Sequence, residues 1–231
     1  MIEKTEKLSK NVQEMIKVGA HFGFLKSRRN PSFKSLICGT KNMTEVIDLD
    51  KTADYLKKVE EYVATLGAQK KTILFASSKS EARAIVEKYA EKISMPFVAG
   101  RWIGGIFTNF SEIKKRVSKL LDLTSKREKG ELLKYTKKER LMIDREIEAL
   151  TEMFAGLKGL EKMPEALFVI DPKREHIAVA EAQKMKIKVI ALASTDCDIR
   201  GIDYPIPAND ASKASIEYFV SRITDAYQKT V

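Results

Sequence analysis

Short apolar runs and helical patterns alternate along most of this chain. The runs at 72–76, 166–170 and 189–193 consist almost wholly of apolar residues, several of them β-branched, which is typical of strands buried on both faces of a parallel sheet. The runs at 45–49 and 204–206 indicate further strands. About five strands separated by helices predict an α/β fold, a three-layer sandwich in which a parallel sheet lies between two layers of helices.

Apolar residues recur at helical spacing between these runs. The first helical pattern stops before Gly19 and the second before Gly67, because glycine commonly follows the last turn of a helix. Two sequences, Ser78–Glu81 and Thr136–Glu139, match the capping box that starts a helix. Further helices are expected up to about Lys92 and over 175–184. The positions expected to face the core are Leu8, Val12, Met15 and Ile16, then Leu56, Val59, Val63 and Leu66, and finally Ile216, Phe219, Val220 and Ile223.

The stretch 108–159 interrupts the alternation and carries no strand signal. A polar segment, 125–130, divides it into two halves, each with a narrow apolar stripe at spacings of three and four residues. The stripes are Phe110, Ile113, Val117 and Leu120, then Ile143, Ile147, Leu150, Phe154 and Leu157. This pattern favours an antiparallel coiled-coil hairpin, inserted at 108–159 into an α/β domain formed by 1–107 and 160–231. Two ordinary core helices are the alternative.

The charge balance favours a polyanionic partner. The 231 residues include 42 Lys and Arg against 32 Asp and Glu, a formal net charge of +10, which suits nucleic acid first and an anionic membrane surface second. A hydrophobic fraction of 44% argues against disorder. No apolar run approaches the ~20 residues that span a bilayer, and no amphipathic membrane anchor is evident. The first residues lack the apolar core of a signal peptide, and Cys38 and Cys197 form no paired motif. A cytoplasmic protein is expected.

Two basic segments are the candidate nucleic-acid contacts. The stretch 21–41 contains no acidic residue, and Asn30-Pro31 and Gly39 break it into predicted loops. The second segment lies on the first helix of the predicted hairpin, where a solvated charged face is the alternative. Side chains at such density neutralise phosphates by shape and charge rather than by reading sequence. The candidates are Lys26, Arg28, Arg29, Lys34 and Lys41, and then Lys114, Lys115, Arg116 and Lys119.

An enzyme is the competing class of function, and the sequence offers little for it. There is no Gly-Lys-Ser or Gly-Lys-Thr loop, and the glycines near 100–105 do not follow dinucleotide-binding spacing. The groups left for a nucleotide- or metal-dependent site at the carboxyl ends of the strands are Asp171, His176, Asp196 and Asp198. A solvated acidic turn explains the aspartates more simply, so no catalytic residue and no cofactor is predicted.

Several motifs in fixed order resemble one family across residues 8–229, the family of the second protein of the bacterial small ribosomal subunit. The most specific is Arg101-Trp102-Ile103-Gly104-Gly105 with Thr108-Asn109. The others include the stretches 18–23 with 30–31, 46–49, 72–75, 136–139, 164–171, 175–178 and 206–210.

The resemblance implies a flavodoxin-like α/β domain with an inserted hairpin, and a structural component of the small subunit without catalytic activity. Members bind small-subunit ribosomal RNA at the head–body junction, help to retain the large first protein of the subunit, and lie near other ribosomal proteins. The implied location is a cytoplasmic ribosome, with an organellar one as alternative, and no homo-oligomer is implied. On this view Arg101, Trp102, Gly104, Gly105 and Asn109 mark the junction between sheet domain and hairpin, with Trp102 in a packing role.

The sequence departs from the family at two places. Phe24 stands where most bacterial members have a second histidine, and Arg28-Arg29 replaces aromatic residues. Some members hold a metal ion with that histidine and carboxylates of the late loop. Without the histidine only Asp196 and Asp198 remain as weak candidates for a divalent ion, so no metal is expected. The two arginines make the segment more basic.

Overall fold

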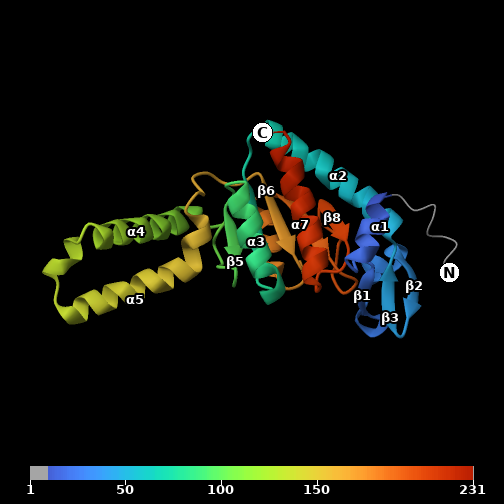
Figure 1. Cartoon of the computed structure of the whole chain (residues 1–231), viewed down its shortest axis with the longest axis horizontal. Coiled ribbons are helices and arrows are strands. Elements are labelled where there is room, and N and C mark those ends of the chain that lie inside the picture. Colours follow the sequence, from blue (N-terminus) through green and yellow to red (C-terminus); the bar gives the residue numbers. More distant parts are fainter. Residues whose placement is uncertain (1–9, 231) are drawn as a thin grey trace.

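The computed structural model describes residues 10–230 and shows an α/β body from which two helices project (Figure 1). The main sheet is parallel throughout. Its strands are β4 (Ile73–Ser77), β5 (Phe97–Ala99), β6 (Ala166–Ile170), β7 (Lys188–Ala193) and β8 (Tyr204–Pro207). They lie in the spatial order β5-β4-β6-β7-β8. Counted along the chain this order is 2-1-3-4-5, that of flavodoxin-like folds, which confirms the predicted fold class.

The strands of this sheet are not quite the five that were predicted. The sequence did not indicate β5, which has only three residues, two of them partly exposed. The run at 45–49 lies instead in a second sheet, where Thr44–Ile47 forms β3. A strand this short leaves too few positions for a recognisable hydrophobic pattern, so neighbouring strands decide whether it pairs.

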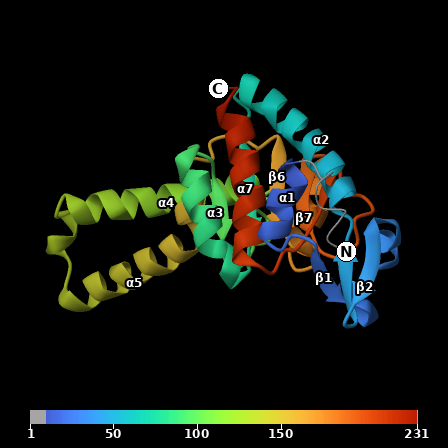
Figure 2. The same cartoon turned by 45° about the vertical axis from the view of Figure 1, so that its right-hand side comes forward.

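Helices cover both faces of the parallel sheet. One face is covered by α1 (Lys10–Lys17), α2 (Leu49–Ala68), α3 (Ser80–Lys92) and α7 (Lys213–Gln228). Figures 1 and 2 show α2, α7 and α3 side by side on this face. The other face packs against α6 (His176–Lys184) and the base of the projecting helices. Successive strand residues alternate between the two cores, Ile73 and Phe75 to the first and Leu74 and Ala76 to the second. Leu8 lies outside the described residues.

A second, antiparallel sheet contains the two ends of the basic stretch 21–41. It consists of β1 (Phe22–Leu25), β2 (Ile37–Lys41) and β3 in the order β1-β3-β2. The prediction of loops for this stretch was therefore wrong in part. The 3-10 helices Lys26–Arg28 and Pro31–Leu36 connect β1 to β2. Asn42 and Met43 both have positive φ, as a two-residue hairpin turn between β2 and β3 requires. Four of the five β2 residues are exposed, so no apolar alternation announced this strand.

The projecting helices are α4 (Phe110–Glu128) and α5 (Lys137–Phe154), followed by the 3-10 helix Ala155–Leu157. Between them Gly130 adopts positive φ, and the 3-10 helix Glu131–Lys134 follows. The capping box at Thr136 is present as predicted. The buried members of the two stripes are Ile113, Val117, Leu120, Ile147, Leu150, Phe154 and Leu157. The domain limits at 1–107, 108–159 and 160–231, and the coiled-coil character of the hairpin, stay predictions. Within 10–230, no helix is both long enough and apolar enough to cross a membrane.

Candidate nucleic-acid interface

The antiparallel sheet is fixed to the carboxyl end of β7. Thr195 accepts a hydrogen bond from the Asn30 N–H at its carbonyl oxygen (2.8 Å) and one from the Phe24 N–H at Oγ1 (2.9 Å). Gly23 lies so close that an added Cβ would stand 2.5 Å from the Thr195 methyl carbon, so only glycine fits there. The connection between β1 and β2, which carries Lys26, Arg28 and Lys34, is therefore held against the parallel sheet at Asn30.

In the segment from β1 through β2, four of the predicted contacts are exposed cations with no internal partner among the described residues: Lys26, Arg28, Lys34 and Lys41. A side chain without an internal counter-ion keeps its charge available for an external phosphate. His21 adds no charge here, because burial and then the charge of Lys41 lower the pKa of this histidine.

Arg29 differs from these four because it has a structural partner. Its Nη1 lies 3.1 Å from Oε1 of Glu45, a side chain with no exposed surface. A carboxylate removed from water needs a counter-charge, and Arg29 supplies it from the edge of the sheet. The sequence could not reveal this pairing, since register and burial decide it. Arg29 cannot be tested for RNA contact without disturbing the fold.

The basic cluster on α4 is also divided by its contacts. Lys115 pairs with Glu112 one turn earlier (2.6 Å), and Lys119 pairs with Glu146 on α5. Lys114 donates to the backbone carbonyl of Glu161 (3.3 Å). Of the four predicted residues only Arg116 is exposed with no such contact in the described part of the chain. The α4 cluster therefore fits the alternative of a solvated, internally paired face, whereas the unpaired cations of residues 26–41 do not.

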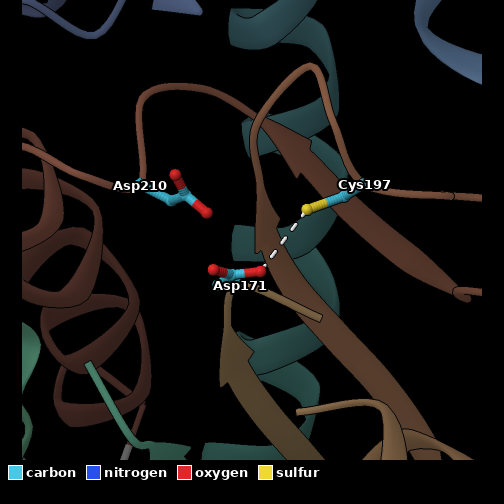
Figure 3. Close-up of side chains that lie close together, drawn as sticks. All are labelled: Asp171, Cys197 and Asp210. Carbon is cyan, nitrogen blue, oxygen red and sulfur yellow. Dashed lines mark hydrogen bonds between the residues drawn. The ribbon is translucent and has the colours of Figure 1, made fainter. Parts of the chain in front are cut away.

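Buried charges hold together the carboxyl ends of the parallel strands. The Nζ of Lys79 lies 2.9 Å from a carboxylate oxygen of Asp171, which follows β6, and 2.9 Å from one of Asp210, which follows β8. Burial alone would lower the pKa of Lys79, but the charge of Asp210 and the hydrogen bonds to both aspartates raise it. The ammonium group therefore stays protonated. Cys197 donates a weak hydrogen bond to Asp171 (3.7 Å; Figure 3).

These residues form the one group in the described structure whose donor atoms could surround a metal ion: Asp171, Cys197 and Asp210. They do not fit a divalent cation, because the ammonium of Lys79 already lies against both carboxylates. Burial also raises the pKa of the Cys197 thiol well above its ordinary value, whereas a metal ligand must be the thiolate. No step of any function is assigned to a metal here.

The two aspartates that were the weak metal candidates, Asp196 and Asp198, each pair with a different cation. Asp196 pairs with Lys173 at 3.0 Å. Asp198 pairs with Arg200 at 2.6 Å, and these hydrogen bonds lower the pKa of Asp198 to about 2. Both line one groove with His176, the remaining candidate of the enzyme hypothesis. Each of these two carboxylates is neutralised by a neighbouring cation, so neither is free to act as a base toward a nucleophile.

The start of α3 differs from the predicted capping box. The helix begins at Ser80, and Lys79 at the N-cap position makes no side-chain cap. The Ser78 N–H instead donates to Oε1 of Glu175 at 2.6 Å. In folds of this strand order the loop after the first strand commonly binds a ligand phosphate. Here the Ser78 N–H, which could donate to such a phosphate, already donates to the Glu175 carboxylate.

Glu181 organises the junction between the sheet and the hairpin. Its carboxylate accepts hydrogen bonds from the backbone N–H groups of Gly105 (2.7 Å), Phe107 (3.1 Å) and Thr108 (3.2 Å). Nε1 of Trp102 also donates to it, at 3.4 Å. The loop that leads into α4 is thereby fastened to α6. Gly105 has a φ of +99°, which explains the glycine at that position.

The remaining junction residues have lesser roles. Trp102 is buried and its ring lies 5.3 Å from that of Phe107, in line with the predicted packing role. Asn109 precedes α4 without a side-chain cap, and Gly104 makes no approach that a Cβ would prevent. Sequence reasoning missed Glu181 and Lys79. The one signal for Glu181 was a charged residue between two alanines within a helical pattern, and the sequence around Lys79, which is flanked by a serine on each side, carried none.

The fold and its surfaces define a class of protein before any comparison. The aspartates at the sheet edge are paired internally, while unpaired cations are displayed on β2 and on the connection between β1 and β2. That arrangement is typical of a protein that binds a polyanion rather than of an enzyme.

Comparisons identify the family. The family model described as Ribosomal protein S2 matches residues 15–230, and the chain belongs to this family. It is 39% identical to the small ribosomal subunit protein uS2 of a Nitratiruptor species, over 93% of this chain and 80% of that protein. The protein of the same name from Chloroherpeton thalassium is 41% identical over 93% and 86%. That from Chloroflexus aggregans is 37% identical over 93% and 90%.

Family membership confirms the resemblance noted in the sequence. The family is a structural, non-enzymatic one, and the chain is not an enzyme. The alternative that relied on Asp171, His176, Asp196 and Asp198 as reacting groups is thereby set aside.

Replacing Arg29 with alanine tests its structural role. The Glu45 carboxylate would then have no counter-ion, so we expect the free energy of unfolding to fall by about 1–3 kcal/mol. This loss is smaller than that expected for a fully buried ion pair, because Arg29 is partly exposed to water. Arg28→Ala removes an equal charge and is expected to change the free energy of unfolding by less than ~0.5 kcal/mol. Urea denaturation compares the two. Equal effects would contradict the pairing.

Glu181→Gln tests the junction and its pH dependence. Burial alone would raise the pKa of Glu181, but the backbone hydrogen bonds from Gly105, Thr108 and Phe107 together lower it. Its stabilisation is therefore complete above the unfolded pKa and is lost as pH falls through the folded one. We expect the variant to be about 2–3 kcal/mol less stable at pH 7.

The difference should narrow below about pH 4.3, the ordinary pKa of a glutamate. Urea denaturation at a series of pH values between neutral and acidic measures it. A stability difference that stays constant across the series would show that the Glu181 charge is not what holds the junction.

Proposed function

We propose that this protein is a structural constituent of the small ribosomal subunit that binds small-subunit ribosomal RNA and contacts neighbouring ribosomal proteins during translation. Its expected protein neighbours include the large first protein of the subunit. It acts as a single copy without a cofactor, on cytoplasmic ribosomes, or on those of an organelle as the alternative. Membership in the Ribosomal protein S2 family and the names of its relatives support this proposal.

The observation that carries the RNA assignment is the set of unpaired cations on β2 and on the connection between β1 and β2: Lys26, Arg28, Lys34 and Lys41. The two strands and the hydrogen bond from Asn30 to Thr195 hold this segment in place, so binding costs little ordering of the backbone. Arg116 extends the same chemistry to the hairpin. We assign Lys114, Lys115 and Lys119 a secondary part, because they give up an internal hydrogen bond or ion pair to reach phosphate.

Exposed apolar side chains support contact with protein neighbours. Near the turn of the hairpin, Leu133 is 73% exposed and Met142 62% exposed. On the antiparallel sheet and its turn, Phe22 is 48% and Met43 76% exposed. Large apolar groups gathered at the two ends of a molecule are typical of surfaces that are covered in an assembly.

Neutralising the four unpaired cations with glutamine tests the RNA assignment. Fewer counter-ions are released when fewer phosphates are neutralised, so the slope of log affinity against log salt should fall by about 1 for each phosphate. We expect at least a tenfold weaker affinity for purified small-subunit ribosomal RNA in filter binding across a range of KCl concentrations.

The matched control removes the same net charge from cations that are paired internally. Its four glutamine substitutions are at Lys71, Lys88, Lys92 and Lys188. This variant should keep most of the parent's affinity. Equally weakened binding in the two variants would mean that net charge, rather than the antiparallel sheet, determines binding.

A further inference from the structure

A cavity at the carboxyl edge of the parallel sheet has no part in the contacts proposed so far. It has a volume of about 400 Å³ and is lined by Ser78, Arg101, Trp102, Arg174, Glu175 and Ile177. Its lining comes from the segments that follow β4, β5 and β6. The strand order reverses between β4 and β6, and open α/β sheets bind their ligands at such a reversal.

The charges of this cavity favour an anion. Arg101 and Arg174 are exposed, and neither side chain has a hydrogen bond or ion pair within residues 10–230. The one carboxylate in the lining, that of Glu175, is buried and accepts the Ser78 N–H. The cavity therefore presents two guanidinium groups that form no ion pair within residues 10–230, and of the two only the charge of Arg174 acts on the Glu175 carboxylate. Guanidinium groups are suited to bidentate contact with phosphate oxygens.

Neighbouring cavities along the same edge lack this feature. In the groove that contains His176, Lys173 pairs with Asp196 and Arg200 pairs with Asp198. A second neighbouring cavity, lined by Arg101 together with Arg83 and Glu87, contains an ion pair: Nε of Arg83 lies 3.5 Å from Oε1 of Glu87. Unpaired positive charge along this edge is thus concentrated at Arg101 and Arg174.

The hydrogen bond from the Ser78 N–H to Glu175 indicates which kind of phosphate fits the cavity, that of a free nucleotide or that of a nucleic-acid chain. A free nucleotide in this fold places its phosphate on N–H groups after the first strand, but Glu175 already takes the Ser78 N–H. A phosphate held only by the rim arginines suits a chain that passes across the edge. Ile177, which is 50% exposed, offers an apolar surface for the attached nucleoside.

We propose that this cavity binds a phosphodiester group of ribosomal RNA through the guanidinium groups of Arg101 and Arg174. The proposal rests on the RNA-binding function proposed above and adds a second contact, separate from the antiparallel sheet. It gives Arg101 a binding role beyond the structural junction.

The test is the double variant Arg101→Gln/Arg174→Gln, measured by filter binding to purified small-subunit ribosomal RNA over a range of KCl concentrations. The matched control is Lys173→Gln/Arg200→Gln, which removes the same charge from paired cations of the adjacent groove. We expect about a tenfold loss of affinity and a salt slope lower by about 1–2 for the double variant. The control should stay within about twofold of the parent. Arg101→Lys/Arg174→Lys should recover part of the affinity, because it keeps the charge but not the bidentate geometry.

Two results would overturn the proposal. One is an Arg101/Arg174 variant that matches the control in affinity and salt slope while the parent binds normally. The other is calorimetric binding of AMP to the parent that the double variant abolishes, which would make the cavity a site for free nucleotides. Failure of the parent itself to bind the RNA would instead overturn the proposed function, and the cavity's role with it.

Discussion

The ammonium group of Lys79 between two buried carboxylates is the interaction on which the rest of the structure depends. It links the start of α3 to the ends of β6 and β8 through Asp171 and Asp210. Removing Lys79 would leave the fully buried Asp210 without its counter-charge, which costs far more than the ion pair gains. The same cluster fills the interior of the edge where a flavodoxin-like sheet would bind its ligand. Because the ion pairs of Lys79 fill this interior, the α/β domain acts as a scaffold, and its candidate binding residues lie on the surface.

A second carboxylate extends this scaffold to the hairpin. Glu181 on α6 gathers the N–H groups of the loop after β5, so α4 leaves the body from a fixed point. The antiparallel sheet is fixed in a comparable way through Thr195 after β7. Both projecting parts therefore start from the carboxyl side of one sheet. A protein that must position separate surfaces on a large RNA benefits from such rigid attachment, because less order is then lost on binding.

The parts of this fold that local patterns could predict are those in which a pattern repeats. The apolar runs of β4, β6 and β7 predicted buried parallel strands, and the stripes at Phe110–Leu120 and Ile143–Leu157 predicted the hairpin helices. Short or polar strands such as β5 and β2 escaped, since their pairing depends on neighbours distant in sequence. Basic residues were visible in the composition. Only burial and pairing separate Arg28, which has no partner among residues 10–230, from Arg29, which compensates Glu45. Glu181 and Lys79 could not be assigned for the same reason.

The central claim is that this chain is held on the small ribosomal subunit, and sedimentation tests it most directly. The tagged chain in a lysate of its own cells is run through a gradient at low and at raised salt. We predict that it migrates with small subunits and remains with them at moderate salt, because non-specific phosphate binding weakens steeply as salt rises. Migration as a free monomer at every salt concentration would contradict the account.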